Sequence, residues 1–158
     1  MNFRVGIGYD VHQLKDGLPL FLGGIRIPHT KGCIAHSDGD ALIHAICDAL
    51  LGAANLRDIG CLFPDTDKSF ENIDSKILLK KTNELLLQKG FKIGNIDSVV
   101  CLQKPKIKDY IPKMQETLSN VLGISADQVS IKATTTEHLG FEGREEGISA
   151  QAIVLIEF

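Results

Sequence analysis

The chain has 158 residues, with 17 Lys and Arg against 20 Asp and Glu, and a formal net charge of −3 at pH 7. With 44% hydrophobic and 23% charged residues, it has the composition of an ordinary globular protein. No long basic run favours nucleic acid binding, and no apolar run is long enough to span a membrane. We expect a single domain over residues 1–158, no signal or transit peptide, and a cytoplasmic location.

The four cysteines are not arranged as a metal site. Cys33, Cys47, Cys61 and Cys101 contain no Cys-x-x-Cys pair. A chain of this length does not need disulfides to hold its core. We therefore expect reduced thiols.

The first elements in the chain are a strand, a hairpin and a helix. Apolar residues alternate with Arg4, Gly6, Gly8 and Asp10 from Phe3 onward, which predicts a strand. The two glycines lack the third glycine and the following helix of a dinucleotide-binding fingerprint. Short apolar runs on both sides of Gly23-Gly24 predict a hairpin. A loop then leads to a helix that we expect to be capped by Ser37, with Asp40 as the acid of a capping box, and to end near Asn55.

The second half alternates between helices and strands. Residues 57–67 form an acidic loop that is too long for a simple connection. We expect helices over 74–89 and 110–122, and strands over 95–102, 129–133 and 148–158. On the first of these helices, Ile77, Leu78, Leu85 and Leu86 are predicted to face inward. The last strand is apolar on both faces, which indicates that a partner subunit covers one of them.

Three residues could bind a metal ion. Asp10 and His12 are two apart on a strand, so their side chains point the same way, and His44 lies early in the predicted helix. A carboxylate and two imidazoles with an open fourth position are typical of catalytic zinc, but they also suit non-haem iron. The same residues could instead be ordinary surface groups. Asp40 and Asp48, one turn on each side of His44, could orient its ring.

Other residues favour a substrate that carries phosphate. Lys104-Pro105-Lys106 presents cations from a turn, and Thr134 to Thr136 offer hydroxyl groups at a strand end. Glu137 could hold a hard cation such as magnesium, and Arg144 lies among glycines that allow a ligand close to the backbone. The Walker pattern is absent, so a P-loop enzyme is excluded.

The whole chain resembles the 2-C-methyl-D-erythritol 2,4-cyclodiphosphate synthases of the non-mevalonate isoprenoid pathway. The motifs that carry the resemblance, in order, are Gly8-Tyr9-Asp10-Val11-His12, His36-Ser37-Asp38-Gly39-Asp40, Asp48-Ala49-Leu50-Leu51-Gly52-Ala53, Asp58-Ile59-Gly60, Phe63-Pro64-Asp65-Thr66-Asp67, Ala133-Thr134-Thr135-Thr136-Glu137, Leu139-Gly140-Phe141 and Gly143-Arg144.

The resemblance implies an α+β fold with a single-layer mixed four-stranded sheet, helices on one face and a small hairpin. It also implies a homotrimer whose sheets face the threefold axis and whose active sites lie between subunits. The expected reaction is attack of the 2-phosphate of 4-diphosphocytidyl-2-C-methyl-D-erythritol 2-phosphate on its β-phosphate, which closes the cyclic diphosphate and releases CMP. Such an enzyme is a phosphorus–oxygen lyase. The trimer could also hold an isoprenoid diphosphate in a central cavity, with Arg144 and Glu146 at its mouth.

The resemblance also assigns roles to individual residues. Zn²⁺ would be bound by Asp10, His12 and His44, and Mg²⁺ or Mn²⁺ by Glu137. His36 and Thr135 would stabilise the transition state. The substrate-binding set would be Asp10, His12, His36, Ser37, Asp58, Ile59, Gly60, Phe63, Pro64, Asp65, Thr66, Asp67, Leu102, Gln103, Lys104, Pro105, Lys106, Ile107, Lys108, Thr134, Thr135, Thr136, Glu137, Phe141 and Arg144.

Two other functions use the same residues. A non-haem iron oxygenase or another hydrolase could use the three ligands, although such sites usually lie in β-barrels and this chain alternates helices with strands. A trimeric binding module without catalysis would bind the nucleotide and never release it from the substrate.

Overall fold

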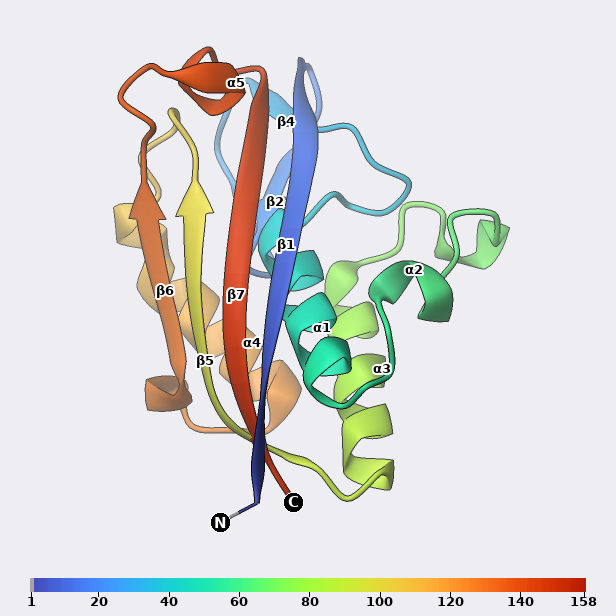
Figure 1. The fold of residues 1–158 in the computed structure, drawn as a ribbon. Coiled ribbons are helices and arrows are strands. Elements are labelled where there is room, and N and C mark those ends of the chain that lie inside the picture. The colour runs from blue at the N-terminus through green and yellow to red at the C-terminus, as the bar shows by residue number, and fades with distance from the viewer. Residues whose placement is uncertain (1) are drawn as a thin grey trace.

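The fold is organised around a five-stranded mixed sheet with the strand order β4-β1-β7-β5-β6 (Figure 1). It is seen in a computed structural model that describes residues 2–158. The strands are β1 (Phe3–Asp16), β4 (Lys31–Cys33), β5 (Lys92–Cys101), β6 (Val129–Thr134) and β7 (Gly147–Glu157). Neighbouring strands are antiparallel except β5 and β6, which are parallel. Strands β2 (Leu20–Leu22) and β3 (Ile25–Ile27) form the predicted hairpin.

The prediction of four strands in the sheet is wrong, because β4 adds a fifth. β1 continues to Asp16, well past the residues whose alternation predicted it, and its last residues pair with Lys31–Cys33. The pairing covers only three residues and includes Gly32. A segment this short carries no detectable alternation, so it could be placed only by its tertiary contact with β1.

The helices form a layer on one face of the sheet (Figure 1). The long ones are α1 (Ala41–Ala53), α3 (Ser75–Gln88) and α4 (Ile111–Leu122). The short ones are α2 (Ile59–Leu62), α5 (Gly140–Gly143) and the 3-10 turns η1 (Lys68–Phe70), η2 (Lys108–Tyr110) and η3 (Ala126–Gln128). None of the helices in residues 2–158 has the length and apolar character needed to cross a membrane.

α1 packs unusually close to β1 because two glycines leave room for it. A Cβ atom at Gly8 would lie 1.9 Å from the carbonyl oxygen of Ala45, and one at Gly6 would lie 2.0 Å from that of Ala49. Both distances are far below van der Waals contact, so only glycine fits at these positions. The glycine pair therefore sets the distance between the first strand and the first long helix.

The N-terminus of α1 differs from the prediction. The cap is Asp40, not Ser37, and the Asp40 carboxylate accepts a hydrogen bond from the backbone N–H of Ile43. The same fully buried carboxylate accepts hydrogen bonds from the N–H groups of Gly23 and Gly24 in the hairpin. Burial raises the pKa of Asp40, although the hydrogen bonds from Ile43 and Gly24 oppose the rise. Asp40 thus joins the hairpin to the helix.

The inward face of α3 was predicted only in part. Leu78 and Leu86 are buried as expected, but Ile77 is 46% exposed and Leu79 is fully buried instead. The polar residues Ser75 and Thr82 also lie on the buried face. Because of them, apolar residues alone do not mark this face at helical spacing in the sequence.

All four cysteines are free thiols, as predicted.

The face of the sheet opposite the helices is apolar and exposed. Even-numbered residues of β7 are buried beneath the helices, whereas Ile153 on the other face is 52% exposed. β1 contributes a row of exposed apolar side chains to the same face, namely Phe3, Val5, Ile7, Tyr9 and Val11. Contiguous apolar patches on a sheet are typical of surfaces that bind another protein.

Candidate active site

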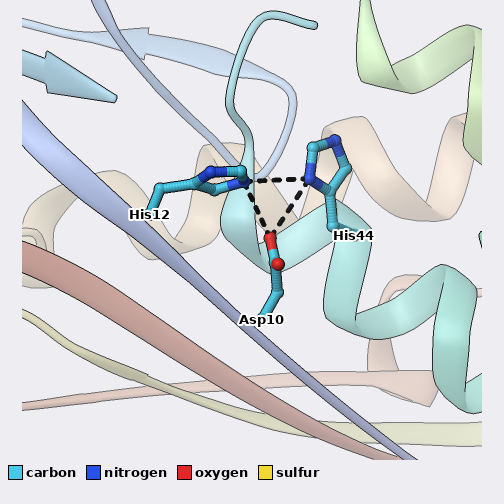
Figure 2. Close-up of side chains that lie close together, drawn as sticks. All are labelled: Asp10, His12 and His44. Carbon is cyan, nitrogen blue, oxygen red and sulfur yellow. Dashed lines mark hydrogen bonds and ion pairs between the residues drawn. The ribbon is translucent and has the colours of Figure 1, made fainter. Parts of the chain in front are cut away.

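Asp10, His12 and His44 converge on one point between β1 and α1 (Figure 2). The Oδ2 atom of Asp10 lies 2.9 Å from Nε2 of His12 and 3.1 Å from Nδ1 of His44. The two histidine nitrogens are 3.1 Å apart. The three residues, predicted from sequence as a candidate metal site, are therefore brought together.

The local backbone explains this convergence. Asp10 and His12 follow each other on the side of β1 that faces α1, and His44 lies in the first turn of that helix. Gly8, two residues before Asp10, contacts α1 at Ala45, the residue after His44. The close approach of strand and helix thus occurs directly beside the three side chains.

The donor set fits a divalent transition metal ion. Zinc bonds of about 2.0–2.1 Å in tetrahedral geometry place neighbouring ligand atoms about 3.3 Å apart. The observed separations of 2.9–3.1 Å are close to this value. One carboxylate and two imidazoles leave a fourth position open to a ligand, and this set suits zinc or non-haem iron.

Burial and mutual attraction shift the pKa values of the triad. Burial raises the pKa of the Asp10 carboxyl group, but hydrogen bonds and attraction from His12 and His44 outweigh it and lower the pKa to about 2. Burial lowers the pKa of His44, but Asp10 and the nearby acids outweigh it and raise the pKa. Asp10 is therefore ionised at neutral pH and available to a cation.

The ring of His44 is oriented by serines rather than by the predicted aspartates. Its Nε2 atom lies 2.9 Å from Oγ of Ser75 and 3.2 Å from Oγ of Ser37. Asp48 instead accepts a hydrogen bond from the backbone N–H of Ile59, and Asp40 is fully occupied as the helix cap. The proposal that Asp40 and Asp48 hold the ring is wrong, because both carboxylates bind backbone donors.

A pocket of about 390 Å³ opens beside the triad. Of the residues assigned to the substrate by resemblance, it is lined by Asp10, His12, His36, Ser37, Ile59, Gly60, Phe63 and Asp65. His36 also lies 3.3 Å from the carbonyl oxygen of Asp67. Asp58, Pro64, Thr66 and Asp67 are not part of the lining. Asp58 and Asp67 cap α2 and η1.

A second pocket of about 170 Å³ lies at the ends of β5 and β6. Its lining includes the assigned residues Leu102, Gln103, Pro105, Lys106, Ile107, Lys108, Thr134 and Thr135. The backbone N–H of His138 donates to the side-chain oxygen of Gln103, which ties the two loops together. Glu137 and His138 both have positive φ angles, at 54° and 63°. The turn at Glu137 is thus sharply bent.

The remaining assigned residues lie outside both pockets. Lys104 pairs with Glu145 at 3.5 Å, and Thr136 donates to the carbonyl oxygen of Leu139. Arg144 forms a two-pronged ion pair with Glu146, at 3.0 and 3.1 Å. Phe141 borders a third hollow together with His12.

One chain does not bring the two pockets together. They share no lining residue. Asp10 pairs with Ala150, Ala150 with Val100, and Val100 with Ala133, so three strand spacings separate the triad from β6. At about 4.8 Å per spacing this amounts to about 14 Å.

A family model described as the YgbB family matches residues 3–157. The chain belongs to the YgbB family. A curated relative from Bacteroides thetaiotaomicron, named 2-C-methyl-D-erythritol 2,4-cyclodiphosphate synthase, is 64% identical over 99% of both chains.

Solved structures agree with the family assignment. A 2C-methyl-D-erythritol-2,4-cyclodiphosphate synthase solved with CDP is 37% identical and has a TM-score of 0.90, with 98% of this chain and 100% of that one covered. The bifunctional IspDF from Campylobacter jejuni is 44% identical with a TM-score of 0.95. The match covers 99% of this chain but only 42% of that one.

Sequence reasoning did not single out Ser75 of this YgbB chain, and it named Asp38 only within the motif His36–Asp40, without a role. Ser75 contacts His44 across a separation of 31 residues, and Asp38 binds Ser75 through both carboxylate oxygens. No periodic pattern relates these positions. The only local sign is that Ser75 follows Asp74, which caps α3.

We expect acidification to weaken metal binding by this YgbB chain. Asp10 stays ionised down to a pH of about 2, so the imidazoles govern the loss. His44 gains a proton as the pH falls through its raised pKa, and the protonated ring cannot bind an ion. The apparent dissociation constant for Zn²⁺ should therefore rise by about tenfold per pH unit for each imidazole that must lose a proton. Competition titration with a chromophoric chelator measures this change. A constant affinity across the acid range would argue against histidine ligation.

Proposed function

We propose that this protein is a cyclodiphosphate synthase that acts as one domain over residues 1–158. The substrate is 4-diphosphocytidyl-2-C-methyl-D-erythritol 2-phosphate, and the product is 2-C-methyl-D-erythritol 2,4-cyclodiphosphate in the non-mevalonate isoprenoid pathway. An oxygen of the 2-phosphate forms a bond to the β-phosphorus, and the bond from that phosphorus to the α,β-bridging oxygen breaks. The electron pair leaves with CMP, which makes the enzyme a phosphorus–oxygen lyase.

The metal triad beside a pocket is the observation that carries this proposal. Asp10, His12 and His44 would hold Zn²⁺, and Glu137 would hold Mg²⁺ or Mn²⁺ across the diphosphate. Bound cations neutralise phosphate charge and favour the crowded arrangement in which two phosphates react. The nucleophile is already an anion and CMP is a good leaving group, so no side chain has to act as a strong base.

The protein residues would bind and position the two reacting groups. His36 and Ser37 border the pocket beside the triad, where they would contact phosphate oxygens. Thr135 lines the second pocket, and its hydroxyl would donate to the transition state together with the imidazole of His36. Correct positioning of an intramolecular reaction is worth about 7–11 kcal/mol.

The two pockets would hold different parts of the substrate. Asp58 to Gly60 and Phe63 to Asp67 would contact the erythritol part. The loops 102–108 and 134–137, with Phe141 and Arg144, would hold the cytidine and its phosphates. The relative solved with CDP supports a nucleotide site in this fold.

We also propose a homotrimer in which each active site lies between two subunits. The exposed apolar face of β1 and β7 needs a partner, and packing three sheets around an axis would cover it. A second copy could also bring its 134–137 loop to the metal pocket of the first, which one chain does not do. A central cavity of such a trimer could bind an isoprenoid diphosphate, although Arg144 is already paired with Glu146.

Two other activities fit less well. A non-haem iron enzyme could use the same ligands, but the helix-on-sheet architecture differs from the β-barrels in which such sites usually lie. A binding module without turnover would bind CDP and leave the diphosphocytidyl substrate intact. Measuring the bound metal and the products distinguishes these cases.

The deciding experiment is an assay for CMP. Protein loaded with Zn²⁺ and supplied with Mg²⁺ should convert the diphosphocytidyl substrate to CMP and a cyclic diphosphate in equal amounts, as followed by ³¹P NMR. The variant His44→Ala, purified in the same way, should bind less zinc and release little CMP. Metal-replete trimer that leaves the substrate unchanged would rule out the synthase.

A further inference from the structure

Ser75 is a fully buried hydroxyl group at the first residue of α3. Its Oγ atom lies 2.9 Å from Nε2 of His44 and 2.5 Å from Oδ1 of Asp38. The backbone N–H of Ser75 donates to the other carboxylate oxygen of Asp38, at 2.9 Å. One side chain thus joins the histidine of the metal triad to an aspartate that contacts no metal ligand.

When the triad holds a metal, the donor and the acceptor of each of these hydrogen bonds are determined. Nδ1 of His44 faces Asp10 and His12, so this nitrogen must offer its lone pair to the ion. The proton of the neutral ring then sits on Nε2, which donates to Oγ of Ser75. Ser75 in turn donates its own proton to Asp38, because an ionised carboxylate only accepts. The hydrogen bonds from His44 to Ser75 and from Ser75 to Asp38 therefore favour the tautomer with the proton on Nε2, which is the one that can bind a metal through Nδ1.

Asp38 also belongs to the turn that carries His36 and Ser37. The backbone N–H of Asp38 donates to the carbonyl oxygen of Ile73 at 3.1 Å, and the N–H of Asn72 donates to that of His36 at 2.7 Å. Together with the two bonds to Ser75, four hydrogen bonds hold residues 36–38 against residues 72–75. We call this set the 36–38 clamp.

The turn needs the clamp because little packs behind it. One side of the turn faces the metal pocket, and the other faces a separate hollow of about 460 Å³. Ile34, Ala35 and Ser37 border both. Since neither side offers a packed core, hydrogen bonds hold the turn over the triad: the four to residues 72–75, the contact of Ser37 with His44 and that of His36 with the carbonyl oxygen of Asp67.

We propose that Ser75 is a positioning residue that fixes the metal-binding tautomer of His44 and, through Asp38, couples metal binding to the position of the His36–Ser37 turn. The proposal rests on the proposed function only in taking this triad as a metal site. Ser75 does not touch the metal or the substrate itself. It acts through the ring that it holds and the turn that it anchors.

The first test compares zinc affinity in three variants. Ser75→Ala should weaken zinc binding by about 10–100-fold, toward the lower end because Ser37 remains as a second acceptor. Ser75→Thr keeps the hydroxyl group and should recover most of the affinity. Ser119→Ala is the matched control, because Ser119 is also a buried helix serine but its hydroxyl group donates to the carbonyl oxygen of Glu116, within its own helix. Wild-type zinc affinity in Ser75→Ala would overturn the proposal.

The second test uses the unmodified protein and does not depend on how the variants fold. Long-range ¹H–¹⁵N NMR of the zinc-loaded protein should show His44 protonated on Nε2, with slow exchange of that proton. Coordination through Nε2 would overturn the proposal.

The coupling to the turn has its own measurement. Zinc should slow hydrogen exchange at the amides of Asp38 and Asn72 in the wild type, and it should slow this exchange less in Ser75→Ala, where the contact of Ser37 with His44 and the backbone bond from residue 75 to Asp38 remain. Equal slowing in both proteins would refute the coupling. All three readouts are made without substrate, so a protein that passes them and still releases no CMP would refute the synthase proposal alone.

Discussion

Replacing Ile7 by glutamate should give a folded monomer that has lost its turnover. Ile7 is 70% exposed in the single chain, so the substitution leaves the core of each subunit intact. In the proposed trimer the other subunits would cover this position, and removing an unpaired carboxylate from water costs several kcal/mol. Light scattering should then report a mass near 17.2 kDa instead of about three times that value.

CMP release by this variant should fall on the order of 100-fold or more, because the two pockets of one chain no longer meet a partner's. Leu87→Glu is the matched control. Leu87 is 54% exposed on α3, away from the apolar sheet face, and the variant should remain a trimer with normal activity. A monomeric Ile7→Glu protein with full activity would mean that one chain holds a complete site.

Gly8→Ala should impair metal binding and folding together. The new Cβ atom would lie 1.9 Å from the carbonyl oxygen of Ala45 and 2.8 Å from the backbone nitrogen of Ala49, so α1 must move away from β1. Overpacking of this kind costs about 1–3 kcal/mol or more. The shift also separates His44 from Asp10, which lie only 3.1 Å apart. We expect a lower melting temperature and a fall in zinc affinity of about 10–100-fold or more, since the ligands are displaced directly.

The control for Gly8→Ala is Gly52→Ala on α1. A Cβ atom at Gly52 would find its nearest neighbour, the carbonyl oxygen of Ile7, at 3.9 Å, which is ordinary contact. Alanine favours a helix over glycine by about 1 kcal/mol, so this variant should be as stable as the wild type or more so. Calorimetry and zinc titration of both variants separate the two cases. Normal zinc affinity in Gly8→Ala would show that the close approach does not position the triad.

The sequence predicted the structure best where apolar residues alternate along a single strand. Alternation in β1 and β7 predicted both strands, and it placed Asp10 and His12 on one side of the sheet. In these places neighbouring residues determine the structure, so a linear pattern is enough.

Prediction failed where contacts between distant residues decide the structure. Ser37, Asp38 and Asp40 are all suitable helix caps, and the choice of Asp40 depends on Gly23 and Gly24 in the hairpin. The partner of His44 is Ser75, on another helix and outside any helical spacing. β4 exists only because the end of β1 is there to pair with it. Each of these features is defined by a tertiary contact.

The two ends of the described chain lie side by side (Figure 1). The backbone N–H of Phe158 donates to the carbonyl oxygen of Asn2 at 3.2 Å. Asp10 is eight residues along β1 from Asn2, a distance of about 26 Å for an extended strand. A domain joined covalently to either end would therefore leave the metal pocket open, and a short linker between the ends would allow the chain to be circularly permuted. The Campylobacter jejuni protein, in which the matched region is 42% of a longer bifunctional chain, is an arrangement that this geometry permits.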